Sequence, residues 1–448
     1  MRRHNIQRSM LAPAAAAAIA LLSTSAFAQV AGEVEFSRGV GFAQSAGETP
    51  RTLGRGLPLK EGDRLTTSDG ASAIIKLQDG TRMTVRPNSE IVISQYQFKE
   101  NAPDNSMLLQ MVRGGFRAVT GLISKSSPNA ARVQTSTATI GIRGTDFDAR
   151  LCQRDCGQES AKVTEAARPN AVLASAKIVT AQGEVYAVDA SSQRRRVVEG
   201  GSIYPGDVVE TSANTRAVLA FRDDSRITLG SNTRFRVDNF VYDENNAGEG
   251  RFLASLLRGS VRALTGLIAK ANNRNVGFST ATATIGIRGS GGDIACADAN
   301  CNNFTLSVWL GSFTVQGGQS ALQVLQAGQA LFITPTGIQA VPPPPVEGPR
   351  PDTVNVPPKL FARDNVSENQ EGLFVFVRDG HIEVATAGEV LHLGKGEAGF
   401  AGNNGDTARP NTIPKFIDFD KLPLPTSKNP LLASVLADAG IKSSNQCK

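Results

Sequence analysis

The sequence predicts an all-β protein built from two copies of one module, and three observations support this fold class. The hexapeptide Thr-Ile-Gly-Ile-Arg-Gly occurs at residues 139–144 and again at 284–289. The apolar residues lie in short runs of β-forming type, and 44 Gly and 22 Pro residues separate these runs. This pattern is typical of short, mostly antiparallel strands that stack as a twisted sandwich or a solenoid-like array with little helix.

Residues 1–28 have the features of a cleavable secretory signal peptide. Three arginines among the first eight residues precede an apolar run at 11–22, and Ala-Phe-Ala at 26–28 fits a cleavage site. As a helix the apolar run would span roughly 18 Å, well short of the ~30 Å hydrocarbon core of a bilayer. We therefore expect export to the periplasm, the outer surface or the medium, and no integral membrane segment in the mature chain.

The first module is predicted at residues 29–160. Gly62-Asp63 marks a turn between apolar runs, and Asp79-Gly80 marks a tight turn between two strands, because glycine adopts a positive φ without a clash of Cβ. A glycine-rich stretch at 113–123 and the hexapeptide then follow. Strands are expected at 71–77, 81–85, 90–98 and 107–112.

The second module is predicted at residues 171–340 and repeats these signals in the same order. Gly206-Asp207 lies 144 residues after Gly62-Asp63, whereas the second glycine-rich stretch, 258–268, lies 145 residues after the first. One residue has therefore been inserted into a loop between the two signals, where insertions are well tolerated. Beyond the second hexapeptide, further strands are expected at 304–315, 322–325 and 330–334.

Residues 360–402 resemble the last strands of the second module, whereas no such strands directly follow the first hexapeptide. We hypothesise that the second module is inserted into the first and that this downstream segment completes the first module. A partial third repeat that stands alone is the alternative.

Two further segments are expected to lack strands. The linker at 341–359 has eight prolines in nineteen residues and is expected to be a semi-rigid, extended spacer. Residues 403–448 are expected to form coil and one short helix at 431–439, because Asn429-Pro430 is a helix-start signal.

Four of the five cysteines form two close pairs, Cys152 with Cys156 and Cys296 with Cys301, at matching places in the two modules. In an oxidising compartment such pairs form disulfides, each worth roughly 2 kcal/mol of stability in the chain-entropy model. A four-cysteine zinc site is the alternative, which the separation of the pairs between two modules disfavours. Cys447 is left to pair with another chain or to stay free.

Charge and motifs point away from nucleic-acid binding and from catalysis. Removal of the three arginines in the signal lowers the formal net charge from +6 to +3, which is weak for a nucleic-acid-binding protein. The basic run at 194–196 is expected to be a solvated loop. The sequence contains no nucleophile elbow, Walker loop or His-Glu-x-x-His motif. We therefore expect no enzymatic activity, no catalytic residue and no cofactor.

Two constellations come nearest to a chemical site. His381 and His392 are expected on the two strands of one hairpin, but no carboxylate or thiolate pattern accompanies them, so no metal site is predicted. Asp146 and Asp148 would share one face of a strand as an acid–base or calcium pair. The second module has Ser-Gly-Gly-Asp at 290–293 instead, so the pair is not shared and a solvated strand edge is favoured.

The hexapeptide carries the sharpest structural signal. Arg143 and Arg288 each lie within an apolar run between glycines, which are Gly141, Gly144, Gly286 and Gly289. A buried arginine needs a carboxylate or carbonyl partner, and Asp63 and Asp207 are the candidates. We expect both arginines to act as structural clamps rather than as ligand contacts.

This order of signals resembles the FecR domain. The Gly-Asp turn, the hairpin, the glycine-rich stretch and the hexapeptide occur at 57–148 and again at 203–293. The resemblance implies an all-β periplasmic module. In the signalling members it also implies sensing of an outer-membrane siderophore transporter and relay through an inner-membrane helix to a sigma factor. The sequence has no apolar stretch of the length that such a helix needs, so direct transmembrane signalling is not expected.

The sequence therefore predicts a non-enzymatic, exported protein of a Gram-negative envelope whose duplicated modules bind or scaffold other envelope or secreted components. An accessory periplasmic sensor in transporter or sigma-factor signalling is the alternative. The expected partners are proteins or glycans, and an exposed strand edge could receive a partner strand. The two copies differ after the hexapeptide, so Asp146, Asp148 and Asp293 are the candidate partner contacts.

Overall fold

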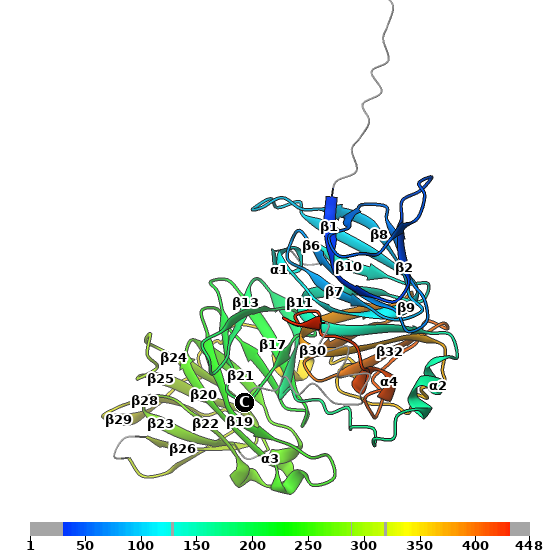
Figure 1. Ribbon diagram of the computed structural model, residues 1–448. Coiled ribbons are helices and arrows are strands. Elements are labelled where there is room, and N and C mark those ends of the chain that lie inside the picture. Colours follow the sequence, from blue (N-terminus) through cyan, green and yellow to red (C-terminus); the bar gives the residue numbers. More distant parts are fainter. Residues whose placement is uncertain (1–29, 127–129, 288, 318–319, 431–448) are drawn as a thin grey trace, which may run out of the picture.

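The computed structural model describes residues 30–126, 130–287, 289–317 and 320–430. About 50% of the chain is strand and 8% is helix, which confirms the all-β prediction. Figure 1 shows two lobes, one of blue, cyan and orange segments and one of green and yellow segments. The signal peptide, Arg288, Cys447 and the predicted C-terminal helix lie outside the described residues, so those predictions stay predictions.

One sheet combines strands from two distant stretches of chain, and we call these strands the first module. They are β1 (Val30–Arg38), β2 (Gly41–Gln44), β3 (Arg51–Thr52), β4 (Pro58–Lys60), β5 (Arg64–Thr67), β6 (Ser72–Leu77), β7 (Arg82–Val85), β8 (Glu90–Gln97), β9 (Ser106–Val119), β10 (Ala131–Gln134), β11 (Thr139–Cys152), β30 (Gly372–Ala385), β31 (Val390–Gly394), β32 (Ala398–Gly402) and β33 (Thr407–Ala408). Among the described residues this sheet has fifteen strands, in the order β3-β2-β5-β8-β9-β10-β11-β30-β32-β33, with the other five paired beside this path.

The strands between these two stretches form the second module. They are β12 (Ala176–Gln182), β13 (Val185–Val188), β14 (Arg194–Val197), β15 (Ser202–Ile203), β16 (Val208–Thr211), β17 (Arg216–Phe221), β18 (Arg226–Leu229), β19 (Arg234–Val241), β20 (Arg251–Arg258), β21 (Ser260–Leu264), β22 (Val276–Ser279), β23 (Ala283–Ile287), β24 (Gly291–Cys296), β25 (Phe304–Leu310), β26 (Ser312–Gly317), β27 (Gln323–Gln326), β28 (Ala330–Thr334) and β29 (Gly337–Val341). In the described part of the chain they form two nine-stranded sheets, β15-β12-β17-β18-β21-β24-β25-β28-β29 and β14-β13-β16-β19-β20-β22-β23-β26-β27.

The two modules have the same strand order. Three long strands of the first module, β9, β11 and β30, each correspond to two shorter strands of the second, β20 with β21, β23 with β24, and β25 with β26. This difference alone turns one fifteen-stranded sheet into two nine-stranded sheets. The duplicated sequence signals therefore specify the same topology twice, and positions in one module can be compared with those in the other.

The first module is closed by a strand that lies more than 200 residues downstream of its neighbour. β30 pairs with β11 in antiparallel register from Thr139 opposite Ala385 to Cys152 opposite Gly372. Figure 1 shows the orange strands β30 and β32 following the teal strand β11. We propose from this pairing that residues 360–402 complete the first module and that the second module is inserted into it.

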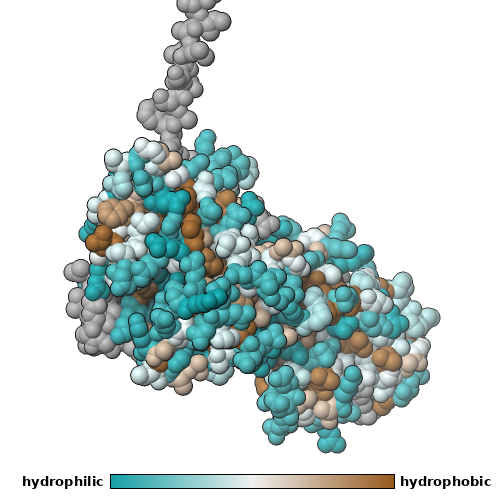
Figure 2. All heavy atoms as spheres, turned by 90° about the vertical axis from the view of Figure 1, so that its right-hand side faces the viewer, coloured by the Kyte–Doolittle hydropathy of each residue, from teal (hydrophilic) through white to brown (hydrophobic). Residues whose placement is uncertain are grey.

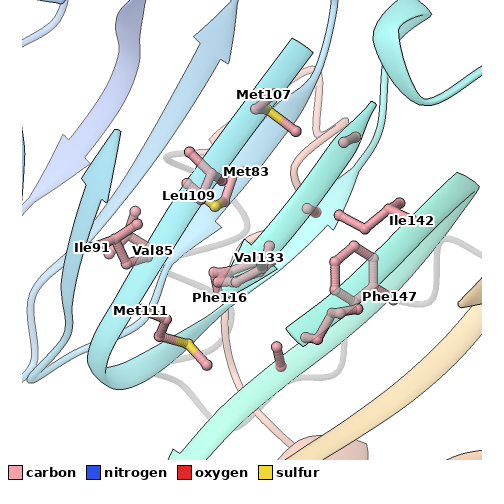
Figure 3. Packing of buried hydrophobic residues seen from close by; sticks show 14 of the residues in the cluster. Met83, Val85, Ile91, Met107, Leu109, Met111, Phe116, Val133, Ile142 and Phe147 are labelled. Atoms are coloured by element: carbon pink, nitrogen blue, oxygen red, sulfur yellow. The ribbon is translucent and has the colours of Figure 1, made fainter. Parts of the chain in front are cut away.

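Each module has its own hydrophobic core between its strands. In the first module, the rings of Phe116 on β9 and Phe147 on β11 meet edge to face, with centroids 5.5 Å apart. Figure 3 shows Met83, Met107 and Met111 lining the same core. The second core is separate and contains a chain of phenylalanines, namely Phe221, Phe235, Phe240, Phe252 and Phe278. Burial of each such side chain contributes roughly 1.5–3 kcal/mol.

Helices are short in the described residues. The α-helices are α1 (Leu122–Ser126), α2 (Cys156–Ala161), α3 (Leu267–Ala271) and α4 (Lys415–Asp418), and the 3-10 helices are η1 (Ala247–Glu249), η2 (Asn273–Asn275), η3 (Pro351–Thr353) and η4 (Pro358–Leu360). None of them has the length and apolarity that a membrane span requires. The prediction of coil at 403–428 was wrong at α4, because Phe416 packs edge to face on Phe374 and orders this turn.

Candidate functional site

Each module carries the same ion pair between two neighbouring strands. Arg117 on β9 lies opposite Asp148 on β11, and Arg117 Nε donates to Asp148 Oδ1 at 2.8 Å. Arg262 on β21 lies opposite Asp293 on β24, and Arg262 Nε donates to Asp293 Oδ1 at 3.0 Å. The side chain of Asp148 is fully buried. The expectation of a solvated strand edge is therefore wrong for Asp148, and this aspartate, unlike Asp146, belongs to the shared framework.

A second donor reaches each of these carboxylates from the next strand. Arg378 Nε on β30 donates to Asp148 Oδ2 at 2.7 Å, and Trp309 Nε1 on β25 donates to Asp293 Oδ1 at 3.0 Å. The strand registers place Arg378 and Trp309 at equivalent positions, because Ala385 and Gln316 both lie opposite the first Thr of the hexapeptide. Each aspartate thus accepts hydrogen bonds from both neighbouring strands, and the second donor is an arginine in the first module and a tryptophan in the second.

A stretch of the same chain that includes a short helical turn lies on each of these sheet faces. We call residues 416–423 the first strap and residues 347–354 the second strap. Thr84 Oγ1 on β7 donates to the carbonyl of Pro423 at 2.9 Å, and Thr228 Oγ1 on β18 donates to the carbonyl of Pro349 at 3.0 Å. Because β7 and β18 correspond, equivalent threonines hold a proline carbonyl in both straps. Much of the expected proline-rich spacer is therefore bound to the second module.

The equivalent arginines of the two modules, Arg117 and Arg262, also contact the straps. In the first module, Arg117 Nη2 lies 3.4 Å from Asp420 Oδ1. In the second, Arg262 Nη1 donates to the carbonyl of Gly348 at 3.0 Å, and Arg350 of the strap stacks over the ring of Trp309 at 4.1 Å. Each face therefore holds its strap through a threonine hydroxyl and an arginine, which contacts a carboxylate in the first module and a backbone carbonyl in the second.

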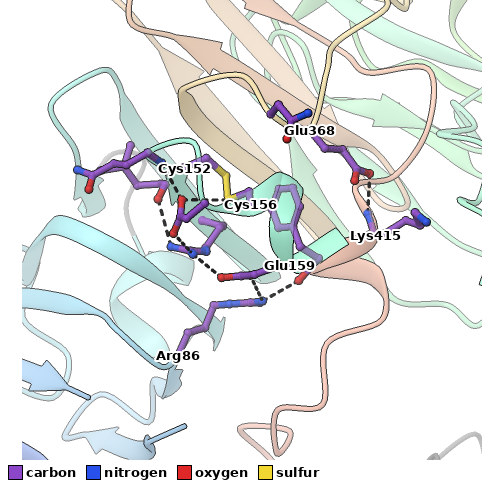
Figure 4. Close-up of a disulfide and its surroundings, with 12 residues drawn as sticks. Arg86, Cys152, Cys156, Glu159, Glu368 and Lys415 are labelled. Atoms are coloured by element: carbon purple, nitrogen blue, oxygen red, sulfur yellow. Dashed lines mark hydrogen bonds and ion pairs between the residues drawn. A yellow bond between two sulfur atoms is a disulfide. The ribbon is translucent and has the colours of Figure 1, made fainter. Parts of the chain in front are cut away.

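The first disulfide lies beside the first strap. Cys152 and Cys156 are joined at the start of α2, and Figure 4 shows Glu159 of this helix next to Arg86. Arg86 Nη2 lies 4.0 Å from Glu159 Oε2 and donates to the carbonyl of Phe416 at 2.6 Å. The disulfide loop therefore helps to position a side chain that holds the strap. Cys296 and Cys301 are joined at the matching place after β24, so both predicted pairs lie at disulfide distance.

The charges at the first face are strongly coupled. Burial alone would lower the pKa of Arg117, but the carboxylates of Asp420 and Asp148 outweigh it and raise the pKa above its ordinary value. Burial, together with the nearby Asp148, raises the pKa of Asp146. Burial also raises the pKa of Asp293, against the opposing effect of Arg262. Asp148 and Asp293 are held by arginine or tryptophan donors and, among the described residues, do not face a nucleophile or a base, as an acid–base pair in catalysis would. The arrangement is therefore suited to holding a polypeptide segment in place.

The hexapeptide arginine acts as a clamp with a different partner from the one expected. Arg143 Nη2 donates to Glu383 Oε1 on β30 at 2.8 Å. Asp63 instead pairs with Arg51 at 2.6 Å, and the equivalent Asp207 pairs with Arg195. The basic run at 194–196 belongs to strand β14, so the expectation of a loop there was wrong. Glu383 lies 240 residues downstream of Arg143, and no local sequence signal links the two residues.

The glycines of the hexapeptide fall into two classes. Gly144 and Gly289 have φ values of +57° and +62°, a region that residues with a Cβ rarely adopt, so the Arg-Gly step needs glycine. Gly141 lies within β11 opposite Glu383, and Gly286 lies within β23 opposite Thr314. The glycines are therefore part of the strand framework.

The key residues of the two faces were missed by the sequence reasoning. Arg117 and Arg262 lie within the glycine-rich stretches, and Thr84 and Thr228 lie at matching positions in the preceding hairpins. Identity at matching positions of the two copies was therefore the available signal. Asp420 had no such signal, because the straps have unrelated sequences.

We expect Asp148→Ala to destabilise the first module by about 3–5 kcal/mol, because it leaves Arg117 buried at 5% side-chain exposure without this counter-charge. The matched change Asp293→Ala should cost the second module less, since Arg262 is 16% exposed. Urea denaturation of both variants, monitored by near-ultraviolet circular dichroism, measures the two losses in free energy of unfolding. Equal losses, or a loss below about 1 kcal/mol for Asp148→Ala, would contradict the proposed role of this ion pair.

Comparisons with known proteins agree with the duplicated architecture. The family model described as FecR protein matches residues 63–167 and 207–314. Two crystal structures of one protein from Parabacteroides distasonis, provisionally assigned as an anti-sigma factor, match at 14% identity and a TM-score of 0.25. Each match covers 30% of this chain, which spans 59% of the solved chain. A comparison with curated proteins gave no match.

Proposed function

Because this chain carries two FecR domains, we propose that it is a non-enzymatic binding protein of the cell envelope that is exported by a cleavable signal peptide. Its partners are other envelope or secreted proteins. The observation that carries this proposal is the pair of straps, in which equivalent threonines of the two modules, Thr84 and Thr228, each bind a backbone carbonyl of another polypeptide segment. Two disulfides support a location in an oxidising compartment.

An open strand edge is the proposed contact surface for a partner. β27 is the last strand of its sheet among the described residues, and Leu322 and Val324 on or beside it are 56% and 51% exposed. The equivalent strand of the first module, β31, is contacted by the second module at Gly200. Elsewhere, on the face seen in Figure 2, hydrophilic residues dominate and apolar residues form small separate groups. An extended segment of a partner could add to β27 by main-chain hydrogen bonds.

Site-specific photo-crosslinking in cells tests this proposal. A photo-reactive amino acid in place of Leu322 should yield one reproducible adduct with an envelope or secreted protein, identified by mass spectrometry. Val390 is the matched control, because it is the first residue of β31, at the position equivalent to Leu322, and is 55% exposed. The adduct from position 322 should be several times stronger than that from position 390. No reproducible adduct from either position, or adducts with unrelated abundant proteins only, would count against the proposal.

A role as an accessory sensor in signalling is the second candidate function, and the FecR family match favours it. In that case the identified partner would be an outer-membrane transporter or a membrane-bound regulator. Deletion of the gene would then change transcription of a sigma-factor regulon, whereas loss of a purely scaffolding protein would leave that transcription unchanged.

A further inference from the structure

Two histidines and a glutamate meet on one face of the hairpin β30–β31. Glu383 lies directly opposite His392 in the strand register, and His381 precedes Glu383 by two residues on the same strand. One ligand atom from each of the three side chains lies within 4.8 Å of the other two. The imidazole rings are stacked, with centroids 5.5 Å apart and planes 23° apart. The carboxylate that the sequence reasoning found missing beside the histidines is therefore Glu383.

Three of the four ring nitrogens of these histidines are buried without a hydrogen bond in the described part of the chain, and one of them, His392 Nδ1, lies 3.9 Å from Glu383 Oε1. Both ring nitrogens of His381 and Nδ1 of His392 are shielded from solvent, and none of them has a hydrogen-bond partner among the described residues. Buried polar atoms in native proteins are normally hydrogen-bonded, so three orphan nitrogens in one cluster require an explanation. Neutral imidazole is the form that coordinates a metal.

The shared fold does not require this cluster. The positions of the second module that correspond to His381, Glu383 and His392 are Ser312, Thr314 and Val324. The second module forms the same pair of strands with these residues. The cluster is therefore specific to the first module, whereas the Arg–Asp pairs are common to both.

We propose that His381, Glu383 and His392 bind a divalent transition-metal ion of the Zn²⁺ class. Two imidazoles and one carboxylate are a ligand set that zinc accepts, and water would complete the coordination. Arg143 holds the glutamate in place by donating to its Oε1, and metal ligands are commonly oriented by such a hydrogen bond from a neighbouring residue. The positive charges of Lys177 and Arg409 beside the cluster are already paired with Glu397.

The ion would act at the junction of the two modules. His392 packs directly on Gly200, where a Cβ would lie 2.0 Å from His392 Cγ and where φ is +75°. Lys177 of the second module donates to the carbonyl of His392 at 3.0 Å. An ion that holds His392 against β30 therefore also fixes the surface on which the second module rests. Metal binding would then stabilise the relative position of the modules.

Calorimetric titration of the chelator-treated, untagged mature protein with ZnCl₂ tests this proposal. We expect one ion per chain with micromolar or tighter affinity, and an increase in the midpoint of thermal unfolding that saturates at the same stoichiometry. Cys447→Ser is used as the background, which removes the fifth cysteine as a competing ligand. His381 and His392 are the only histidines downstream of residue 28, so a signal from imidazole ligation reports on this cluster.

Two variants decide whether the ion lies at this cluster. His392→Gln and Glu383→Gln should each weaken zinc binding at least tenfold, and the glutamine at 383 keeps an acceptor for Arg143, which protects the fold. Thr314→Ala in the second module should leave the affinity unchanged. The proposal is overturned if the parent protein shows no saturable binding below about 100 μM, or if both folded variants bind as tightly as the parent.

Discussion

A chain that ends after Pro357 should lose the folded first module and keep the second. This truncation removes β30, which supplies five fully buried side chains to the first core, Leu373, Val375, Val377, Ile382 and Val384. At about 1.5–3 kcal/mol each, their loss is comparable to the entire stability of a typical domain, about 5–15 kcal/mol. The second module keeps its strap, including the Thr228 bond to Pro349.

Differential scanning calorimetry of the truncated and parent proteins measures this effect. The parent should show two unfolding transitions, or one broad transition that resolves into two, and the truncated chain should show only the transition of the second module. A chain that ends after Pro430 is the control, because it retains every described residue and should behave as the parent. Two intact transitions in the chain ending at Pro357 would show that residues 360–402 do not complete the first module.

Glu397→Ala should destabilise the protein by about 3–5 kcal/mol, because it removes the only carboxylate of a buried ionic trio. Glu397 Oε2 lies 2.9 Å from Lys177 Nζ and 2.8 Å from Arg409 Nε, and all three side chains are at most 1% exposed. Burial lowers the pKa of Lys177 to about 8 although Glu397 opposes this shift. Without the carboxylate, Lys177 can lose its proton, whereas Arg409 stays charged and buried.

Lys177→Met provides the matched comparison, because Glu397 then keeps Arg409 as its partner. We expect this variant to lose less stability than Glu397→Ala, and the double variant Lys177→Met with Glu397→Ala to lose less than the sum of the single changes. Urea denaturation gives all four free energies of unfolding. Strict additivity would show that the buried trio is not energetically coupled. Since Lys177 belongs to the second module, the Glu397→Ala protein should also show faster proteolysis between the modules.

The sequence predicted local structure well wherever turn chemistry and apolar alternation agree. Asp79-Gly80 and the flanking runs correctly placed the hairpin of β6 and β7, and the run at 90–98 is β8. The duplication also predicted that both modules share one strand order. Residue contacts between strands far apart in the sequence were harder to predict, because the register of β11 with β30 has no local signal in the sequence. This limitation explains why Asp63, and not Glu383, was expected beside Arg143.

The candidate site was predictable only in part. Asp148 and Asp293 were selected as candidate partner contacts, and Asp148 was also expected at a solvated strand edge, whereas both are paired with arginines, Arg117 and Arg262. The identity of these arginines in both glycine-rich stretches could have indicated the ion pairs. The straps could not have been found, because their sequences are unrelated and neither carries a local signal for the surface on which it lies. His381 and His392 were found, but their carboxylate partner depends on the same hairpin register.

The proposed insertion of one module within the other has a consequence for the order in which the chain can fold. β11 is synthesised early, yet its neighbour β30 follows only after the whole second module, since the paired residues Asp148 and Phe376 are 228 residues apart. The nested module contains all of its own strands and can fold first, whereas the outer one must wait with an unpaired, aggregation-prone edge. The folded inner module then brings the two ends of its parent together and shortens the loop that the late strand must close.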